Sequence, residues 1–394
     1  MLRFLTAGES HGPLLTGILE GMPAGVPLTA ADIDADLARR QQGYGKGGRM
    51  AIEKDHVRFA AGVVAGQTTG APIALLVENR DYKNWADKLI DPMTTPRPGH
   101  ADLTGAVKYG YRELRLSLER ASARETTMRV AVGAVCKRLL AEFGIRVQGY
   151  VTAIGDVSAD LPPVDAAQYP ARFDAAEAND VRCPDPAAAE RMHDAIRAII
   201  QAKDTLGGII EVAALGVPPG LGSHVHYDRK LDGQLMGAVG SIPAVKGVEI
   251  GHAFEQASWP GTKVHDELFA ENGELRRRSN RAGGLEGGIT TGEPVIVRAA
   301  VKPIATTLNP LQSVDLASGE PKATDYERSD FCPVPRGVPI VEAMVAIVLA
   351  NALIEKLGGD SLDEMRPRFA ALRRNRLEDL PMDNRPWQFN YEYS

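Results

Sequence analysis

The stretch VPIVEAMVAIVLANALI, residues 338–354, is the longest apolar run in the chain and the part of the sequence that most constrains the fold. It carries Glu342 and Asn351, and it is shorter than the roughly 20 residues that a membrane span requires. We therefore predict a buried helix from about Ile340 to Leu357, ended by Gly358-Gly359, in a cytoplasmic protein.

The composition is that of a globular protein. Of the 394 residues, 44% are apolar, which is enough for a core, and 24% are charged. The formal net charge of −6 argues against a nucleic-acid-binding protein that depends on its overall charge. Cys136, Cys183 and Cys332 form no CxxC pair, so we predict no structural metal and a reducing compartment.

Local patterns predict a mixture of helices and strands. Capping residues and periodicity indicate helices over about 30–42, 103–118, 186–203 and 231–239, and one that starts at Ser122 and ends at Gly144. Strands are predicted over 209–215 and 294–301. Loop excursions are expected near 81–95, 155–185 and 255–281, and a polar tail from about 372.

Near the N-terminus, Gly8-Glu9-Ser10-His11-Gly12 places a hydroxyl beside an imidazole between two glycines. Glycine adopts backbone angles that other residues avoid, so this segment can turn sharply and let a ligand approach. Histidine titrates near neutrality and is the usual proton carrier in enzymes. The alternative is a plain loop between two apolar segments.

The segment Gly43-Tyr44-Gly45-Lys46-Gly47-Gly48-Arg49 contains the pattern GxGxxG. A dinucleotide-binding fingerprint needs a strand before it and a helix after it. Here a predicted helix comes first and Met50-Ala51-Ile52 resembles a strand, so that interpretation fails. What remains is either an anion site or a solvated loop that carries Arg39, Arg40, Lys46 and Arg49.

Two further segments add cations to this set. The prolines of Pro96-Arg97-Pro98-Gly99-His100 stiffen a loop that presents Arg97 and His100 together. Arg120 and Arg124 surround the predicted helix start at Ser122, where unpaired N–H groups favour a phosphate. A structural histidine and an ordinary salt-bridged helix are the alternatives.

A second glycine cluster, residues 283–292, leads through a strand to the segment 302–307, KPIATT. Backbone that a ligand can approach, followed by a lysine and hydroxyls, suits the phosphate or ring edge of a cofactor. The P-loop pattern GxxxxGK[ST] is absent. Taken together, the residues indicate an enzyme that acts on a polyanionic small molecule.

Three segments resemble the signature stretches of the chorismate synthase family: GESHG, ERASARET at 119–126, and RSDFC…EAM at 328–344. RRQQGYGKGGRM, RPGHAD, NRAGGLEGGITTG and KPIATT are similar to other stretches of that family, so the resemblance covers most of the chain. It implies an α+β fold, a β-α-β sandwich in which antiparallel sheets enclose helices. It also implies a single domain over residues 1–394 and a homotetramer.

The resemblance further implies a lyase that converts 5-enolpyruvylshikimate 3-phosphate to chorismate and phosphate. This 1,4-trans elimination is the last step of the shikimate pathway, and in that family it requires reduced FMN without net redox change. NADPH is a candidate reductant of the flavin. The expected partners are this small-molecule substrate and further copies of the chain, with no nucleic acid, membrane or metal.

By the same resemblance, His11 is expected to protonate or polarise the leaving phosphate and His100 to lie beside the flavin as its proton donor. Asp330, relayed with Ser10, is expected to assist proton removal. The substrate's phosphate and carboxylates are expected at Arg40, Lys46, Arg49, Arg97, Arg124 and Arg328. FMN is expected at Arg120, Ala121, Ser122, Pro243, Ala244, Gly288, Lys302, Pro303, Ile304, Ala305, Thr306 and Arg328. NADPH is expected at Arg40 and Lys46.

Two details belong to these expectations. Lys46 stands where many members of the family have arginine. Two parallel hydrogen bonds from a guanidinium group to an anion would therefore be replaced by contact with a single ammonium charge.

The loop 43–49 and the Arg-rich segment 255–281 are expected to act as lids that order when ligands bind.

Two other classes of protein remain open. An NADPH-dependent flavin oxidoreductase would show net hydride transfer and would release no phosphate. A non-enzymatic binder of polyanions or nucleic acid would lose affinity steeply with salt and would need no flavin. The net charge of −6 and the scarcity of aromatic residues beside the arginines count against the binder.

Overall fold

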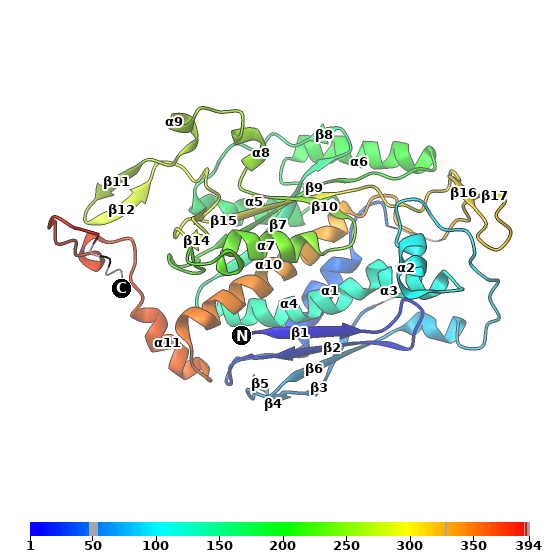
Figure 1. Ribbon diagram of the computed structural model, residues 1–394, viewed down its shortest axis with the longest axis horizontal. Coiled ribbons are helices and arrows are strands. Elements are labelled where there is room, and N and C mark those ends of the chain that lie inside the picture. The colour runs from blue at the N-terminus through cyan, green and yellow to red at the C-terminus, as the bar shows by residue number, and fades with distance from the viewer. Residues whose placement is uncertain (47–53, 328, 390, 392–394) are drawn as a thin grey trace.

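Two antiparallel sheets enclose a layer of helices, so the fold is an α+β sandwich, as the sequence led us to expect (Figure 1). The computed structural model describes residues 1–46, 54–327, 329–389 and 391. A four-stranded sheet lies along one side of the helical layer and a five-stranded sheet along the other (Figure 1).

The four-stranded sheet has the order β1-β2-β6-β3, and each pair in it is antiparallel. Alternate residues point into the core, as the pleat requires, so that Ile73, Leu75 and Val77 are buried on one strand. Its strands are β1 Arg3–Ala7, β2 Leu14–Glu20, β6 Ile73–Glu78 and β3 Val57–Ala61, beside the short pair β4 Val63–Val64 and β5 Gln67–Thr68.

The five-stranded sheet has the order β10-β15-β9-β7-β8 and is also antiparallel. Its central strands pack on the core helix α10 and, on the far side, β7 contacts α5, so residues on both faces of β9 are buried. Its strands are β10 Val245–Ile250, β15 Val295–Val301, β9 Gly208–Leu215, β7 Arg146–Ile154 and β8 Val157–Ser158.

The helical layer is built on α10, which packs against α4, and α4 packs in turn on β2 and β6. Of the apolar window of α10, 83% is buried inside the protein, so this long helix is a core helix, as predicted. The helices of this layer are α1 Ala30–Gln41, α4 Thr126–Ala141, α7 Leu231–Gly240 and α10 Val334–Leu357.

α10 begins at Val334, six residues before the predicted start, although it then contains Pro335 and Pro339. Pro335 lies in the first turn, where the missing N–H costs little. Pro339 cannot donate to the carbonyl of Pro335, but Arg182 Nη1 donates to that oxygen at 2.6 Å. A side chain from outside the helix therefore replaces the lost bond.

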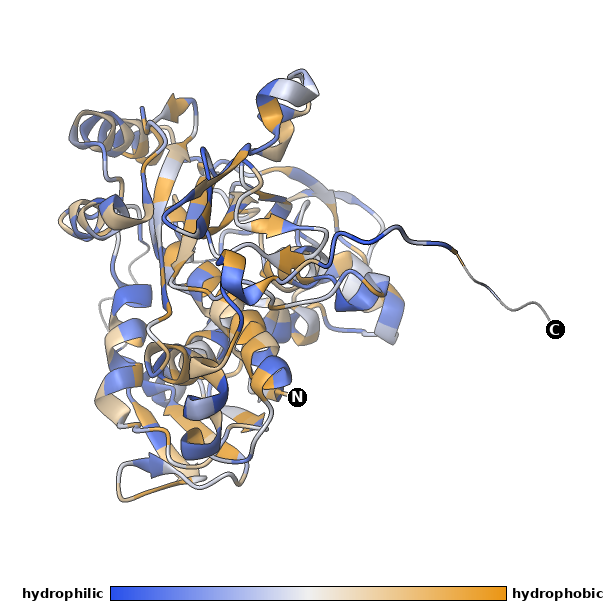
Figure 2. Ribbon diagram, turned by 90° about the vertical axis from the view of Figure 1, so that its left-hand side faces the viewer, coloured by the Kyte–Doolittle hydropathy of each residue, from blue (hydrophilic) through white to orange (hydrophobic). Residues whose placement is uncertain are grey.

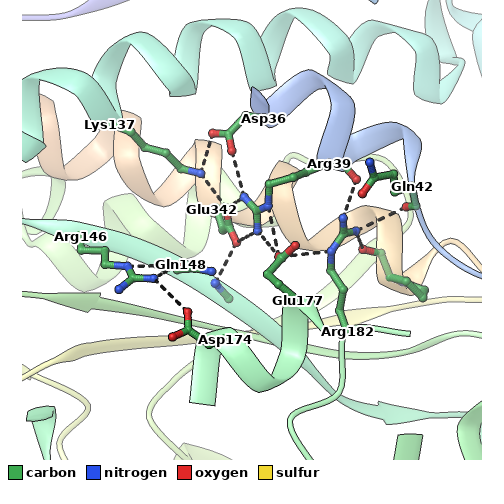
Figure 3. Close-up of polar contacts among 12 residues, drawn as sticks. Asp36, Arg39, Gln42, Lys137, Arg146, Gln148, Asp174, Glu177, Arg182 and Glu342 are labelled. Carbon is green, nitrogen blue, oxygen red and sulfur yellow. Dashed lines mark hydrogen bonds and ion pairs between the residues drawn. The ribbon is translucent and has the colours of Figure 1, made fainter. Parts of the chain in front are cut away.

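The carboxylate of Glu342, on α10, is fully buried and is neutralised by two cations (Figure 3). Arg39 Nη1 and Nη2 donate to it at 2.7 and 2.8 Å, and Lys137 Nζ donates at 2.6 Å. The backbone N–H of Gly149 adds a bond of 2.9 Å from β7. Burial alone would raise the pKa of Glu342, but these cations lower it to about 2.

Two of the predicted helices differ in detail. The stretch 103–118 forms two helices, α2 Asp102–Tyr109 and α3 Arg115–Ala121, because Gly110 adopts a φ of 69° and ends the first. The helix expected from Ser122 begins as the 3₁₀ turn η3 Ala123–Glu125 and continues as α4. The Ser122 side chain accepts from the N–H of Arg124. The other helices and strands for which residue ranges were predicted are confirmed within two residues. The strand-like segment Met50-Ala51-Ile52 lies outside the described residues.

The predicted excursions contain short elements. Residues 155–185 include α5 Tyr169–Glu177, and residues 255–281 include the hairpin β11 Leu268–Glu271 and β12 Glu274–Arg277. That hairpin belongs to the segment 255–281, which we expected to act as a lid. It lies at the opposite end of the molecule from α2 and α3, so it does not cover α3 of the same chain (Figure 1). The C-terminal tail leaves the body of the protein (Figure 2).

The remaining described elements are short connections and peripheral helices. They are η2 Arg80–Asn84, η4 Ala166–Gln168, α6 Pro186–Gln201, η5 Tyr227–Arg229, α8 Ala253–Gln256, α9 Gly261–Val264, β13 Leu285–Glu286, β14 Ile289–Thr290, β16 Gln312–Val314, β17 Pro321–Ala323, α11 Leu362–Ala370 and η6 Leu377–Asp379.

Candidate functional site

The short helix α3 and the turn after it bring the two predicted catalytic loops together. Ser117 Oγ donates to the carbonyl of Ala101, beside His100, at 2.8 Å. Two residues later, the carboxylate of Glu119 accepts from the backbone N–H of His11 at 2.7 Å. The segment 119–126 that we singled out in the sequence therefore organises the site.

The loop that carries His11 is held in a fixed turn. Asn79 Nδ2 donates to the carbonyls of Ser10 and Gly12, at 3.0 and 2.8 Å. Gly8 has a φ of 112°, and a Cβ there would lie 2.6 Å from the carbonyl oxygen of Leu14. Only glycine fits at this position, which explains the glycine that precedes Ser10 and His11.

The imidazole of His11 is bound by Glu119, since His11 Nδ1 lies 2.5 Å from Glu119 Oε1. Burial would raise the pKa of Glu119, but the hydrogen bonds from His11 outweigh it and lower that pKa. Ser10, the other predicted catalytic residue of this loop, is buried, and Ser122 Oγ lies 3.1 Å from its Oγ.

His100 is bound in the same way by Asp102, which is fully buried. His100 Nδ1 lies 2.6 Å from Asp102 Oδ1, and Arg97 donates to both carboxylate oxygens at 2.8 and 2.9 Å. Arg97 Nη2 also lies 3.0 Å from His100 Nδ1. Because the contact to Asp102 is shorter, we assign the Nδ1 proton to the bond with Asp102.

Asp102 is the electrostatic centre of this loop. Burial would raise its pKa, but the hydrogen bonds from His100 and Arg97 lower it well below its usual range. Arg97 Nη1 reaches on to Thr306 Oγ1 at 3.1 Å. The predicted substrate residue Arg97 is therefore engaged with Asp102 and with the predicted cofactor segment.

Arg40 and Arg124 meet at Asp55, and all three side chains are buried. Arg124 Nη1 donates to both oxygens of Asp55, at 2.7 and 2.8 Å, and Arg40 Nη1 lies 3.5 Å from the same carboxylate. Arg40 also donates to Thr126 Oγ1 at 3.1 Å. The structure thus brings two predicted substrate residues to the turn at the start of α4.

Asp330 connects this pair of arginines with the His100 loop. Its carboxylate pairs with Arg336, and Arg336 Nε donates to the carbonyl of Arg40 at 3.0 Å. Ser329, next to Asp330, donates to the carbonyl of Thr306, and the hydroxyl of Thr306 accepts from Arg97. These contacts and the short chain segments between them link Arg97, Asp330 and Arg40, and Asp55 adds Arg124; we call these four residues, Arg40, Arg97, Arg124 and Asp330, the cation arc.

Part of the predicted cofactor set also lies near His100. Lys302 Nζ donates to the carbonyl of Gly99 at 2.6 Å, and its backbone N–H donates to the carbonyl of Ala244 at 2.9 Å. Burial and the neighbouring Lys246 lower the pKa of Lys302. The segment 302–306 thus joins the His100 loop to Ala244.

Arg120 and Pro243 line one cavity of about 340 Å³. Its wall also carries Arg129, which donates to Ser241 Oγ at 2.7 Å and pairs with Glu125 at 2.8 Å. Arg120 itself donates to the backbone of Thr6 and Gly8. Ala121 and Ser122 follow Arg120 directly at the end of α3.

Some predicted residues are not brought together. Gly288 packs against Lys230 at the start of α7, whereas Pro243 and Ala244 follow the end of that helix. Lys46 is exposed and is the last residue described before the gap at 47–53. Arg49 and Arg328 lie outside the described residues.

The sequence indicated the histidines but not the residues that hold them. Glu119 and Asp102 were assigned no role, and neither were Asp55 and Arg336. Asp102 could have been found, because it lies two residues from His100 in the same stiff loop. Glu119 lies 108 positions from His11, so only the packing of α3 on the N-terminal loop reveals the contact.

The arrangement is suited to proton transfer next to a polyanion. Two imidazoles are each paired through Nδ1 with a carboxylate, and His100 also contacts the buried Arg97. Among the residues that the structure describes, no group of three or more histidine, cysteine or acidic side chains is placed to hold a metal ion.

Both the sequence and the structure of this chain are similar to those of known proteins. The family model described as Chorismate synthase matches residues 2–354. The chorismate synthase of Trichlorobacter lovleyi is 53% identical over 382 residues, which is 93% of this chain and 97% of that protein. The chorismate synthase of Bacillus cytotoxicus is 53% identical over 379 residues, with the same shares covered.

Structure gives the same relationship. A crystal structure of a chorismate synthase superposes with a TM-score of 0.78 at 43% sequence identity. The match covers 94% of this chain and 96% of that one.

Proposed function

This chain belongs to the chorismate synthase family, and we propose that it converts 5-enolpyruvylshikimate 3-phosphate to chorismate and phosphate by a 1,4-trans elimination that requires reduced FMN. Its membership makes it an enzyme, a lyase that serves the shikimate pathway and aromatic amino acid biosynthesis. The observation that carries the proposal is the pair of histidine–carboxylate contacts joined by α3.

The elimination needs one proton delivered and one removed. The C–O bond to phosphate breaks, and His11 donates a proton to the leaving phosphate oxygen. Asp330, with Ser10, assists removal of the hydrogen from the carbon at the other end of the allylic system. Because the site is buried and polar, fixed cations stabilise the departing charge more strongly than water would.

The proposed anion contacts are the arginines of the cation arc. Arg40, Arg97 and Arg124 are buried, so their guanidinium groups are already fixed in place when the substrate arrives. Lys46, Arg49 and Arg328 complete the proposed set for the phosphate and the two carboxylates. Arg40 and Lys46 are also the proposed contacts of NADPH as a reductant of the flavin.

The described residues fit a phosphate-bearing flavin. The cavity beside Arg120 and Pro243 carries two guanidinium groups and the Ser241 hydroxyl, which suit a phosphate. Burial and the neighbouring Lys246 lower the pKa of Lys302, and a bound anion would oppose this by stabilising the charged ammonium group. The proposed FMN contacts are Arg120, Ala121, Ser122, Pro243, Ala244, Gly288, Lys302, Pro303, Ile304, Ala305, Thr306 and Arg328.

When bound, reduced FMN supplies electron density to the breaking allylic system, and His100 is proposed to hold a proton next to it. Asp102 and Arg97 keep the His100 ring in one orientation. We also propose a homotetramer of single-domain chains in the cytoplasm, without metal, nucleic acid or membrane as partners. Gly288, distant from Ala244 in one chain, is the residue that fits this cofactor set least well.

Phosphate release from 5-enolpyruvylshikimate 3-phosphate tests the proposal. It is measured anaerobically with photoreduced FMN and, as the matched control, with oxidised FMN. We expect release only with reduced FMN, in step with chorismate absorbance and without net flavin oxidation. NADPH in place of light then tests the reductant.

The outcome that contradicts the proposal is equally definite. Hydride transfer from NADPH to flavin without phosphate release would favour the NADPH-dependent oxidoreductase. Substrate binding that needs no flavin and falls steeply with salt would favour a simple polyanion binder.

A further inference from the structure

The face of the His11 ring is covered by Trp85, from a segment to which the function above assigns no role. The ring centroids of His11 and Trp85 are 4.1 Å apart, with an angle of 45° between the rings. Aromatic rings at this separation attract one another, and a tryptophan face attracts a cation. The imidazole therefore has one edge on Glu119 and one face on Trp85.

Trp85 is itself fixed by hydrogen bonds. Its Nε1 donates to Asp81 Oδ2 at 3.0 Å, and Asn84 Nδ2 donates to Asp81 Oδ1 at 2.8 Å. Asp81 is buried. The same segment begins with Asn79, which holds the carbonyls of Ser10 and Gly12. One segment, 79–85, therefore holds both the backbone of the His11 loop and the plane of its ring.

Glu119 restricts the remaining freedom of the ring. One carboxylate oxygen accepts from the backbone N–H of His11 and the other lies 2.5 Å from its Nδ1. The backbone and the side chain of His11 are thus bound by one group, which sets both the ring orientation and the tautomer. Since Nδ1 is used in this contact, exchange of a proton with a ligand falls to Nε2.

We propose that Glu119 and Trp85 are positioning residues for His11, which together hold its imidazolium so that Nε2 delivers the proton to the leaving phosphate. The proposal rests on the function proposed above. In this step the Nε2–H bond breaks, an O–H bond forms on the phosphate, and the imidazole is left neutral, with its remaining proton on Nδ1 and hydrogen-bonded to the Glu119 carboxylate. No other reactant is needed.

The other charges near this group come from three directions. Arg115 lies one turn before Glu119 and acts on its carboxylate. Lys88 lies 4.9 Å from the centre of the Trp85 ring, and Asp81 lies at its indole nitrogen. The Glu9 carboxylate folds back on its own turn near Gly12. Among the residues that the structure describes, Glu119 is the one of these charged groups that contacts the imidazole.

Trp85 provides a readout that requires no turnover. The chain has three tryptophans, so replacing Trp259 and Trp387 by phenylalanine leaves Trp85 as the one emitter. An imidazolium in contact with an indole quenches its fluorescence more strongly than a neutral imidazole does. In this double variant we expect emission to fall as the pH falls, with a single transition, and we expect His11→Gln to abolish that transition.

Glu119→Gln in the same background keeps the shape of the side chain and removes its charge. We expect the fluorescence midpoint to move to lower pH, because the substitution removes the negative charge that lies 2.5 Å from His11 Nδ1. A midpoint that does not move, or a transition that persists in His11→Gln, would overturn the proposal. Thermal unfolding of each variant checks that it is folded.

Turnover then separates positioning from simple packing. We expect Glu119→Gln to lower kcat by about tenfold or more with KM nearly unchanged, and the alkaline limb of the pH–kcat profile to follow the fluorescence midpoint, because a proton donor must be protonated to act. Trp85→Phe should retain more activity than Trp85→Leu, because a ring face remains. Equal losses of activity in Trp85→Phe and Trp85→Leu, with the pH–kcat profile unshifted in both, would contradict a positioning role for Trp85.

The two proposals can fail separately. If the wild-type protein releases no phosphate while the fluorescence midpoint still depends on Glu119, the proposed function is wrong and the contact of Glu119 with His11 stands. If phosphate is released and Glu119→Gln leaves both kcat and the midpoint unchanged, the proposed function stands and the positioning role is wrong.

Discussion

Asp102 shows, at the scale of one residue, how one buried carboxylate holds two of the predicted site residues. It is fully buried and binds Arg97 and His100. Asp102→Asn keeps the shape but leaves the Arg97 guanidinium buried without its counter-charge. Breaking a buried pair in this way costs about 3–5 kcal/mol. We expect the free energy of unfolding, measured in urea, to fall by that amount.

Asp325→Asn is the matched control. Asp325 is 80% exposed and pairs with Lys322 at 3.6 Å, so the same change there should alter stability by less than about 0.5 kcal/mol. Equal stability of Asp102→Asn and the wild-type protein would mean that Arg97 does not depend on an ionised Asp102.

At the scale of the element, the contact between α4 and α10 depends on Gly133. A Cβ at this position would lie 2.3 Å from the Cβ of Ala343 and 2.5 Å from its Cα. Alanine normally gains about 1 kcal/mol over glycine inside a helix. Here that gain is outweighed, since the two helix backbones must separate. We expect Gly133→Ala to lower the free energy of unfolding by about 2 kcal/mol or more.

Gly237, inside α7, provides the control for that substitution. A Cβ there would meet nothing within 4 Å, so Gly237→Ala should stabilise the protein by about 0.5–1 kcal/mol. If both substitutions stabilise the protein equally, the close approach of α4 to α10 is not a constraint on the fold.

The cluster around Glu342 makes a prediction with a pH dependence. The folded-state pKa of about 2 lies below the usual 4.5, so the unfolded chain takes up the proton first. The stabilisation is therefore complete above about pH 4.5 and is lost as the pH falls toward 2. We expect Glu342→Gln to cost about 3–5 kcal/mol near neutral pH, because Arg39 and Lys137 lose their anion.

Urea unfolding of both proteins at several pH values checks this. The difference in unfolding free energy should be constant from pH 8 to about 5 and should narrow below that. A difference that grows on acidification would mean that folding raises the pKa of Glu342. It would contradict the assignment of Glu342 as an ionised group.

Elements were easier to predict from the sequence than their ends. The helix α10 was expected from its apolar run, but its first six residues were not, because Pro335 and Pro339 normally oppose a helix. What permits the early start is Arg182, which binds the carbonyl of Pro335 from 153 positions away. Such a contact depends on tertiary packing and leaves no local pattern.

For the molecule as a whole, the sequence indicated the segments that meet at α3 but not how they meet. His11 and His100 were recognised because glycines and prolines mark their loops. Glu119 and Asp55 were missed, since acidic residues are common and their partners lie far away in the chain. The roles assigned to all of these site residues remain predictions, and Arg49 and Arg328 also lie outside the described residues.

The C-terminal tail gives a prediction that concerns the whole chain. The sequence indicated a polar tail from about residue 372, yet its first part is fastened to the body. Leu275 N–H donates to the carbonyl of Asn375 at 2.7 Å, and Leu377 N–H donates to that of Gly273 at 2.9 Å. Asn375 Nδ2 donates to the carbonyl of Thr291 at 2.7 Å. Residues 381–389 and 391 are exposed, and the C-terminal part of the chain extends away from the body (Figure 2).

Truncation at two points distinguishes these parts of the tail. Ending the chain at Leu372 removes these three hydrogen bonds and the one from Arg374 Nη2 to the carbonyl of Phe369, and should cost about 2–3 kcal/mol. Ending it at Leu380 removes Trp387 and Phe389, which are 75% and 72% exposed, and should change the free energy of unfolding by less than about 0.5 kcal/mol. Urea unfolding at two protein concentrations measures both. If the shorter truncation destabilises the protein, and more so when the protein is concentrated, then these aromatic side chains are buried against another copy of the chain.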